Sequence, residues 1–443
     1  MTEVERESMT SNLERETTSV LQRLVRFNTV NPPGNERPAL EYLASYVGAA
    51  GFETELLGAE EQRPNLIATL PGAADGPTLG LLGHIDTVLA DAAEWTHDPW
   101  SGDVADGFLW GRGAIDMKSQ VAAEAVGAVA LASSGWRPAR GQLRLMFVSD
   151  EETGGGLGAR WLSEQHPDKV RCDMLINEGA GEVFEYGGRR LYGVCCGEKG
   201  LFRFRLTARG VAGHASLPRM GDNALLKLAP VLAKFGEAGM AYDVGAVPAA
   251  LLKGLAQDPN DPAGAVARIA QTDPALAALT EPLLGVTLSP TMAHASDKIN
   301  VIPSRAEVKV DCRVPPGLTQ DRVQQRIAEA LGTTLESVEL DFIDVIPGNE
   351  STVESPLMDA ISRWVQDNDA GAGTVPVVLA GGSDSRWFRA AFPDCVAYGF
   401  FPQRHMDLLQ TSPLVHSADE RIDVRDLGFA ARFYHDIARE LLG

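Results

Sequence analysis

The sequence predicts an α/β fold, in which a mostly parallel sheet is flanked by helices and interrupted by an inserted α+β unit. Two observations support this prediction. Short apolar runs alternate with helical patterns up to about residue 179 and again after residue 350, as expected for strands that are buried on both faces. From about Gly200 the pattern changes to strands that alternate between apolar and polar residues, which is typical of strands with one exposed face.

The elements predicted for the first region follow its apolar patterns. Helices are expected at 13–28 and 38–50, separated by the Pro/Gly turn NTVNPPGNE, and a helix rich in Ala and Val is expected at 117–134. Strands are expected at 65–70, 78–86, 143–149 and 173–179. Because ligands of such sheets bind at the carboxyl ends of the strands, the residues that follow each strand are the candidates for chemistry.

The inserted region is expected to contain both kinds of element. Its strands are expected at 202–210, 306–314 and 336–344, and its helices from Asp222, within 236–290 and at 319–331. The first sheet is expected to resume at 375–380 and 395–400, before a closing helix at 424–441. We therefore expect one domain formed by residues 1–199 and 350–443, and an inserted domain formed by residues 200–349.

The composition excludes some classes of protein. With 39 Lys and Arg against 60 Asp and Glu, the formal net charge is -21, which argues against nucleic acid and anionic membranes as partners. The acidic N-terminus does not resemble a signal peptide, and no apolar stretch approaches the length of a membrane span. No CxxC pair occurs among the cysteines, so we expect reduced thiols in a cytoplasmic protein.

Two segments place candidate metal ligands beside glycine-rich turns. LGLLGHID puts His84 at the end of an apolar strand, where a ring nitrogen can reach a metal. Asp86 points the same way two residues later and is expected to hold the other ring nitrogen. GRGAIDMK puts Asp116 between a turn and a helix. Each segment alone also has a structural interpretation, as a core contact or as a helix cap.

Further acids follow two other apolar strands. SDEETGG places Glu151 and Glu152 after one strand, and INEGAG places Glu178 after another. His416 lies in LVHSADER, before the last helix. A solvated turn would also explain consecutive acids, but two histidines and several carboxylates at one edge of a sheet favour a shared metal site. Such nitrogen and oxygen ligands suit zinc, with cobalt or manganese as alternatives.

Taken in order, GHIDTV, GRGAIDMK, SDEETGG, NEG and VHSADE resemble the signature segments of the dinuclear zinc aminoacylase/carboxypeptidase family. This family includes aminoacylase, carboxypeptidase G, carboxypeptidase S, acetylornithine deacetylase and succinyl-diaminopimelate desuccinylase. The resemblance covers essentially the whole chain. It implies a catalytic domain with an inserted lid and dimerisation domain, two Zn²⁺ ions, and hydrolysis of an amide bond next to a free carboxylate.

The resemblance implies a ligand for each position of the two metals. Asp116 would bridge the metals. His84 and Glu178 would complete one metal site, and Glu152 and His416 would complete the other.

The resemblance also implies roles for two neighbouring acids. Asp86 would orient the metal-binding histidine. Glu151 would be the general base, which takes a proton from water and later gives one to the leaving amine. In the family the peptide bond after the bridging aspartate is usually cis, so we expect a cis Asp116–Met117 bond.

Within the inserted domain, VAGHASLPRMGDNAL resembles the family's lid motif. There the residue that matches His214 reaches the active site of the partner subunit and stabilises the oxyanion, which implies a homodimer. An ordinary surface histidine is the alternative interpretation. Asn300 and Arg313 match other lid residues that contact substrate.

After the inserted domain, GGSDSRWFR resembles the aminoacylase-type loop that holds the substrate carboxylate. Arg386 is the candidate there because a guanidinium group suits a carboxylate. Gly382 and Ser383 belong to the same loop and are expected to help bind substrate.

The long Ala- and Leu-rich insert between His214 and Asn300 resembles the carboxypeptidase S and N-fatty-acyl-amino-acid hydrolase branch of the family. Met117 departs from that branch, which often has a second acid at this position. The leading hypothesis is hydrolysis of N-acyl-amino acids, or of C-terminal residues of short peptides. The alternatives are a biosynthetic deacylase of the acetylornithine or succinyl-diaminopimelate type, for which a shorter lid is expected, a dipeptidase, or a catalytically silent paralogue that binds a small acidic metabolite.

Overall fold

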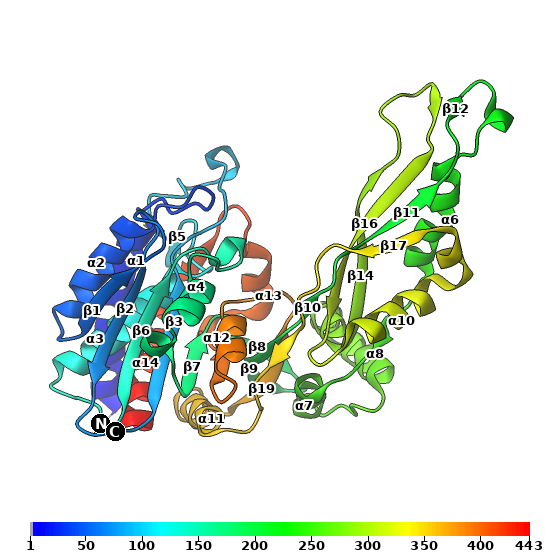
Figure 1. Cartoon of the computed structure of the whole chain (residues 1–443). Helices are drawn as coiled ribbons and strands as arrows, with labels where there is room; N and C mark the ends of the chain where they lie inside the picture. Colours follow the sequence, from blue (N-terminus) through cyan, green and yellow to red (C-terminus); the bar gives the residue numbers. More distant parts are fainter. Residues whose placement is uncertain (1–2) are drawn as a thin grey trace. The chain divides into compact units, whose positions relative to one another are not determined.

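A computed structural model describes residues 3–443 of the chain, with side chains from Glu7 onward (Figure 1). The chain divides into two compact units. The first unit contains the residues up to Cys196 together with Ser351–Val377 and Ser383–Gly443. The second unit contains Gly197–Glu350 and Val378–Gly382.

The first unit is built on a large sheet with helices on both faces. Its helices are α1 (Glu3–Val25), α2 (Arg37–Gly48), α3 (Lys118–Ser133), α4 (Ala159–Gln165), α5 (Pro167–Val170), α11 (Pro356–Asn368), α12 (Ser385–Ala391), α13 (Leu408–Thr411) and α14 (Val424–Leu442). The main path of the sheet runs β1 (Glu53–Leu57), β2 (Asn65–Pro71), β6 (Gln142–Val148), β3 (Thr78–His84), β7 (Met174–Asn177), β20 (Val396–Gly399), β9 (Arg189–Glu198), β8 (Glu182–Tyr186) and β21 (Gln403–Asp407).

The sheet has a parallel centre, and its flanks are antiparallel except for the parallel pair β8–β21. β6, β3, β7 and β20 are parallel neighbours, whereas β1–β2, β2–β6, β20–β9 and β9–β8 are antiparallel. The α/β class predicted from the sequence is thus confirmed, but the sheet is mixed where a mostly parallel one was expected. For β8 and β9 the reason is local, since the short turn at Gly187–Gly188 can join only antiparallel strands.

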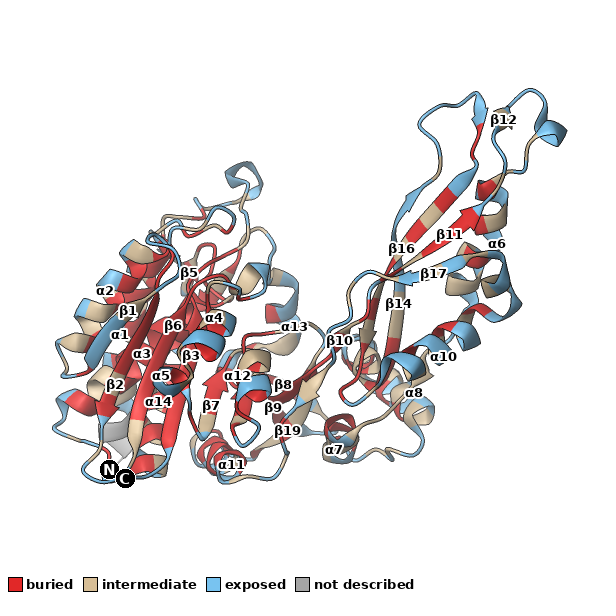
Figure 2. Cartoon of the chain, in the orientation of Figure 1, coloured by how far each residue is buried: buried red, intermediate tan, exposed pale blue. Residues whose placement is uncertain are grey.

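Apolar packing on both faces fixes the central strands. Leu82 of β3 packs with Leu162 of α4 and Phe388 of α12 on one face. On the opposite face, Gly83 lies against Val121 of α3, and a side chain at this glycine would collide with it. The central strands are therefore buried along their whole length, as Figure 2 shows for β3 and β6. This arrangement holds the ends of the parallel strands in fixed positions.

The second unit carries a smaller, antiparallel sheet covered by helices. The path of this sheet is β13 (Ala241–Tyr242), β14 (Gly285–His294), β16 (Arg305–Val314), β11 (Phe204–Arg209) and β17 (Glu339–Phe342), with β10 (Gly200–Leu201) paired to β16. Its helices are α6 (Ala224–Glu237), α7 (Ala246–Gly254), α8 (Pro262–Thr272), α9 (Pro274–Thr280) and α10 (Gln320–Leu331). A separate two-residue ladder joins β12 (Gly213–His214) to β15 (Val301–Ile302).

Most predicted elements occur where the sequence places them, with ends shifted by a few residues. Several strands were missed, among them β1, β8, β9 and β14. The expected run of helices within 236–290 ends in the first half of β14, and the hairpin of β8 and β9 was not predicted. The Gly187-Gly188 dipeptide was the sequence signal for this hairpin. Both glycines have positive φ (60° and 73°), as a two-residue hairpin turn requires.

Candidate metal centre

The predicted ligands are placed by the ends of the central strands and by two loops. His84 is the last residue of β3, and Glu178 directly follows β7. Glu152 lies in a short 3-10 turn, Glu151–Thr153, that follows β6. Asp116 precedes α3, but its side chain does not cap that helix, so the helix-cap interpretation does not apply. His416 lies in the loop before β22 (Arg421–Asp423).

Asp116 stands between the two histidines. Its Oδ1 lies 3.0 Å from Nε2 of His84, and its Oδ2 lies 3.1 Å from Nε2 of His416. Glu178 Oε2 lies 3.7 Å from the same nitrogen of His84, and Glu152 Oε2 lies 3.3 Å from that of His416. The two carboxylate oxygens of Asp116 therefore face two different nitrogen donors, each with a further acid beside it. This is the arrangement that a carboxylate bridging two metal ions requires.

The described residues contain two overlapping groups of potential metal ligands, and within each group the ligand atoms lie within 4.8 Å of one another. One group is His84, Glu151 and Glu178, and the other is His84, Asp116 and Glu152. The peptide bond between Asp116 and Met117 is cis, which confirms the prediction.

Two backbone positions in these loops are unusual. Asp150, which precedes Glu151, has φ of 74°, and His416 has φ of 59°. Residues other than glycine rarely adopt positive φ, and such strain concentrates at functional sites. The surrounding contacts hold Asp150 in place, since its carboxylate accepts hydrogen bonds from Leu157 N (3.0 Å) and Thr153 Oγ1 (2.6 Å).

The chemistry of the donor set fits two divalent cations. Burial raises the pKa of Glu178 to about 7, with a further rise from the negative charge of Asp116. Burial and the charge of Glu178 likewise raise the pKa of Glu151 well above its usual range. One buried oxygen of Glu152, Oε1, has no hydrogen-bond partner within the described residues. In this cluster, burial and the neighbouring negative charges disfavour ionisation of the acids, and one buried oxygen is unpaired. Bound metal cations would stabilise the ionised acids and would accept such an oxygen as a ligand.

The histidines show the complementary effect. Hydrogen bonds to Asp116 and Glu152 raise the pKa of His416 to about 10. Burial lowers the pKa of His84, but Glu178, Asp116 and Asp86 outweigh it and raise the pKa well above the usual value. Both imidazoles therefore lie in a strongly negative environment, which favours any bound cation, whether a proton or a metal.

Asp86 does more than orient His84. Nδ1 of His84 lies 3.0 Å from the carbonyl oxygen of Asp86 and 3.5 Å from its Oδ1, so the carbonyl is the nearer acceptor and leaves Nε2 for a metal. The carboxylate of Asp86 accepts hydrogen bonds from the backbone N–H groups of Glu151 and Glu152, both at 3.1 Å. Asp86 thus joins the end of β3 to the turn that carries the expected general base.

Asn31 is a site residue that the sequence did not single out. It is 5% exposed, and its Nδ2 lies 2.8 Å from Asp86 Oδ2 and 3.1 Å from Asp150 Oδ1. It belongs to the NTVNPPGNE segment, which was interpreted only as a turn. The available signal was an asparagine within a Pro/Gly turn, which is too common to indicate a role in a site.

In the second unit, the structure brings His214 and Asn300 together. Ala215 N donates to Asn300 O at 3.1 Å, and His214 pairs with Val301. Ser216 N donates to Nδ1 of His214 at 3.2 Å, so the neutral ring carries its proton on Nε2. The exposed His214 therefore offers an N–H donor, which is the group that an oxyanion needs.

The structure separates Arg313 from this pair. Arg305 begins β16, immediately after the β15 segment, whereas Arg313 lies eight residues further along β16. At about 3.4 Å per residue, that separation is roughly 27 Å. Arg313 instead pairs with Asp311 at 2.8 Å.

The GGSDSRWFR loop contacts the end of β7. Oγ of the buried Ser383 and Oγ of Ser385 lie 3.3 and 3.0 Å from Nδ2 of Asn177, the residue before Glu178. Gly382 precedes this contact, and the backbone N–H of Arg386 donates to Ser383 O at 3.3 Å. The loop is thus anchored beside a predicted ligand through side chains of the first unit.

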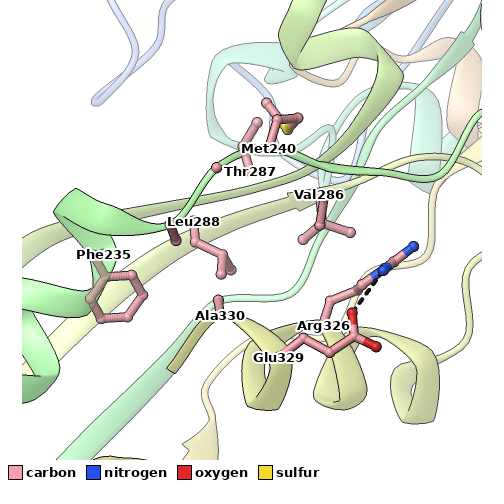
Figure 3. Close-up of a pocket in the computed structure, with 11 residues that line it drawn as sticks. Phe235, Met240, Val286, Thr287, Leu288, Arg326, Glu329 and Ala330 are labelled. Atoms are coloured by element: carbon pink, nitrogen blue, oxygen red, sulfur yellow. Dashed lines mark hydrogen bonds and ion pairs between the residues drawn. The ribbon is translucent and has the colours of Figure 1, made fainter. Parts of the chain in front are cut away.

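A cavity of about 430 Å³ lies in the second unit, between α6, α10 and β14 (Figure 3). Apolar side chains such as Phe235, Val286 and Leu288 line it. The Arg326 and Glu329 side chains at its edge form an ion pair at 2.7 Å. None of the predicted site residues lines this cavity, so it is not a part of the metal centre.

Within the described part of the chain, none of the helices has the length and apolar character of a membrane span.

The fold and the ligand set define a metal-dependent hydrolase. Comparison with known proteins then identifies the family. Residues 80–440 match the model of peptidase family M20/M25/M40, and the chain belongs to this family. The dinuclear zinc family predicted from the sequence is thereby confirmed, as is an enzyme that acts on amide bonds.

Individual relatives are more distant. The chain is 29% identical to a succinyl-diaminopimelate desuccinylase of Paracoccus denitrificans (strain Pd 1222), over 94% of this chain and 95% of the relative. A metallo-carboxypeptidase of the M20 family from Sulfolobus solfataricus has a similar fold, with a TM-score of 0.71 and 18% identity over 95% of this chain and 98% of that one.

A dinuclear metal-binding M20 peptidase from Bacillus subtilis also has a similar fold, with a TM-score of 0.61 and 15% identity over 98% of this chain and 99% of that one. Together with the His, Asp and Glu cluster, the family confirms the prediction of a two-metal cofactor, for which zinc is typical.

Proposed function

We propose that this enzyme hydrolyses N-acyl-amino acids, or removes C-terminal residues from short peptides, so that the amine product carries a free carboxylate. The observation that best supports the proposal is the position of Asp116 between the Nε2 atoms of His84 and His416, with an acid beside each. This geometry supports Asp116 as the bridging ligand, His84 and Glu178 as ligands of one metal, and Glu152 and His416 as ligands of the other.

Glu151 is the general base of the proposed reaction. When bound, two divalent cations would polarise the amide carbonyl and lower the pKa of a water molecule. Glu151 takes the proton of that water and later delivers a proton to the nitrogen of the leaving amine. Burial raises the pKa of Glu151 well above its usual value, which makes its carboxylate a stronger base for the first step and keeps the proton on it until the second. Asp86 holds the backbone of Glu151 in place through the hydrogen bond at 3.1 Å.

Arg386 is proposed to bind the substrate carboxylate, with Gly382 and Ser383 in the same loop. Two observations support this assignment. The loop is tied to Asn177 beside the predicted ligand Glu178, and Arg386 lies at the start of α12, directly after the anchoring serines. A planar guanidinium group can hold a carboxylate through two hydrogen bonds, which would place the amide in a constant position. Asn300 and Arg313 are proposed as further substrate contacts from separate parts of the second unit, since Arg313 lies far along β16 from the segments of His214 and Asn300.

A second candidate is a deacylase of the succinyl-diaminopimelate type. The curated relative from Paracoccus denitrificans, a desuccinylase, favours it. We expected such deacylases to have a shorter lid, but that relative aligns with this chain over nearly the whole length of both. The long insert therefore does not separate this chain from desuccinylases, and the argument for a long-chain acyl substrate loses its main support.

Release of free amino acid from a substrate panel tests the proposal. The panel contains N-acetyl, N-succinyl and N-long-chain-acyl amino acids together with dipeptides, each assayed with zinc or cobalt. Turnover of several N-acyl-amino acids supports the leading candidate, and turnover of succinylated substrates alone supports the second. Absence of turnover from protein that carries two metal ions would overturn both and favour a silent binding protein.

Two substitutions test the assigned roles. We expect Glu151→Gln to retain both metals and to lose turnover, because only the proton acceptor is removed. We expect His84→Ala to lose metal, as elemental analysis would report. His97→Ala is the matched control, since His97 is a partly buried histidine of the same unit that lies outside the cluster. Its ring is tilted against that of Trp110, with the ring centroids 4.6 Å apart. Equal metal content in the two histidine variants would contradict the ligand assignment.

We further propose a homodimer in which His214 acts at the active site of the partner subunit. The segments beside His214 expose large apolar side chains, including Met220 at 75% and Ile299 at 102%. The residues of β14 beyond Pro290 are also exposed and pair only with β16 among the described strands. Surfaces of this kind favour a protein partner.

A mixing experiment tests this arrangement. Glu151→Ala and His214→Ala are each expected to be inactive as pure proteins. After the two variants are unfolded and refolded together, action in trans restores about one quarter of the wild-type activity, since half of the dimers are mixed and each has one complete site. No recovery in a mixture shown to contain mixed dimers, or a fully active monomer in gel filtration, would contradict the proposal.

A further inference from the structure

Glu420 is a buried acid that none of the assigned roles uses. It is fully buried, and both of its oxygens accept hydrogen bonds from one loop. Oε1 accepts from Ile115 N at 2.6 Å and Asp116 N at 3.0 Å. Oε2 accepts from Arg112 Nη1 at 2.6 Å and Gly113 N at 3.1 Å. The carboxylate therefore fills a nest of donors that the loop before α3 provides.

The two segments joined in this way each carry a predicted ligand. Asp116 donates its own backbone N–H to Glu420, and His416 lies four residues before Glu420. The segments are about 300 residues apart in the sequence, and the His416 loop has a backbone of unusual conformation, with φ of 59°. A direct link to Glu420 therefore restricts the relative position of the Asp116 carboxylate and the His416 ring.

We propose that Glu420 is a positioning residue that holds Asp116 and His416 at the separation required for one of the two metal ions. The inference rests on the proposed ligand set. It predicts an unequal effect on the two metals. The ion held by Asp116, Glu152 and His416 depends on two ligands that Glu420 fixes. The ion held by Asp116, His84 and Glu178 depends on one.

The first unit offers a matched control for this role. Asp426 is also a fully buried carboxylate that accepts three backbone N–H bonds, from Arg404 at 2.6 Å, His405 at 2.9 Å and Met406 at 2.9 Å. None of its donor residues is a predicted ligand. Glu420→Gln and Asp426→Asn therefore each replace a buried carboxyl group that accepts three backbone N–H bonds, and Glu420→Gln also removes the ion pair with Arg112. In each variant the NH₂ group of the new side-chain amide faces backbone N–H groups, so that two hydrogen-bond donors face each other.

The experiment measures metal binding by full-length protein that has been stripped of metal with a chelator. Zinc is titrated into the wild type, Glu420→Gln and Asp426→Asn, and the number of ions bound and their affinities are recorded. We expect one of the two zinc affinities to fall about 10–100-fold in Glu420→Gln, which is typical when a residue that supports a ligand is lost. We expect the other affinity to change less, and Asp426→Asn to bind both ions as the wild type does.

Amide hydrogen exchange of metal-free protein provides a second measurement, independent of turnover. The amides of Gly113, Ile115 and Asp116 should exchange faster in Glu420→Gln than in Asp426→Asn. Glu420→Asp keeps the charge but shortens the side chain by one methylene. It is expected to show a smaller change of the same kind, and it carries the test if Glu420→Gln does not fold.

Two outcomes would overturn the inference. One is unchanged binding of both zinc ions by a folded Glu420 variant. The other is an equal loss of zinc affinity in the Glu420 and Asp426 variants, which would indicate general destabilisation. Failure of the proposed function is distinguishable, because a wild type that binds fewer than two zinc ions would contradict the ligand set itself.

Discussion

Asn31→Ala should impair both the stability and the turnover of this enzyme, although Asn31 is not a predicted ligand. The side-chain amide carries two hydrogens, and the nearest acceptors are Asp86 Oδ2 at 2.8 Å and Asp150 Oδ1 at 3.1 Å. Both acceptors are buried carboxylates. The substitution therefore leaves two buried charges, each with one fewer donor.

The expected magnitude follows from these two bonds. A hydrogen bond to a charged group contributes about 1.5–3 kcal/mol, so the loss of two costs about 3 kcal/mol or more. A water molecule that enters the space recovers part of this, which makes about 3 kcal/mol the working value. The thermal midpoint of the metal-free protein should fall by roughly 3–5 °C. Because Asp86 also holds the backbone of Glu151 and Glu152, kcat should fall about tenfold or more, with a small change in KM.

Asn28→Ala is the matched control, since it removes the same side-chain group three residues earlier. The Asn28 amide is on the surface, where its Oδ1 accepts one hydrogen bond from Val30 N at 3.1 Å. Its loss should cost about 0.5–1 kcal/mol and leave kcat unchanged. Thermal unfolding and steady-state kinetics of the two variants decide the question. Equal midpoints and equal kcat values in Asn31→Ala and Asn28→Ala would refute the reasoning.

Three further predictions concern pH, metal and backbone packing. Burial raises the pKa of Glu124 well above its usual value, so the stability that its protonated form provides is fully present below the unfolded pKa and decreases as the pH rises toward the folded pKa. Glu124→Gln removes this dependence. The free energy of unfolding of the variant, relative to that of the wild type, should therefore rise by up to about 1.4 kcal/mol per pH unit between pH 5.5 and 7.5, as denaturant unfolding would report. A difference between the two proteins that does not change with pH would contradict the raised pKa of Glu124. Removal of metal by a chelator should abolish turnover and lower the thermal midpoint, and added zinc should restore both, because an ion that binds only the folded state stabilises it. A midpoint insensitive to chelator would speak against a buried metal pair. A methyl group on Gly399 would lie 1.9 Å from the carbonyl oxygen of Glu178, and one on Gly141 would lie 1.8 Å from Pro77 O. Both alanine variants should lose stability, but only Gly399→Ala should lose zinc affinity as well; equal zinc binding in the two would show that the Glu178 backbone tolerates displacement.

The sequence predicted that these side chains gather because His84, Glu152 and Glu178 end or follow apolar strand patterns, whereas their roles as ligands were implied by the family resemblance. His84 and Glu178 end or follow short apolar runs that are typical of buried strands, and parallel strands bring their carboxyl ends to one edge of a sheet. Spacing along the chain then matters little, because the sheet brings the ends together. The same reasoning explains why the turn with Glu151 was predicted beside them.

The residues that support the ligands could not be predicted in the same way. Asn31 lies in a Pro/Gly turn, and Glu420 lies in a polar segment before the last helix, so neither has a local pattern that indicates burial. Each acts through contacts between segments that are far apart in the sequence. The antiparallel flanks of the sheet were missed for a related reason, since the direction of a strand depends on its partners rather than on its own residues.

The metal centre is therefore held together by buried hydrogen bonds as well as by apolar packing. Asp86 joins the end of β3 to the turn that carries Glu151 and Glu152, and Glu420 joins the loop of Asp116 to that of His416. Each of these two acids uses backbone N–H donors, whose positions are fixed by the chain and do not depend on side-chain rotamers.

This arrangement has a consequence for the protein before it binds metal. Without cations the predicted ligand acids repel one another, and the charge of Asp116 adds to burial in raising the pKa of Glu178. The acids can remain close only if other interactions oppose the repulsion. Asp86 and Glu420 supply these interactions through their backbone donors, so the site can be formed before the metal arrives. A preformed site loses less conformational entropy on binding than a flexible one, and it therefore binds its ions more tightly.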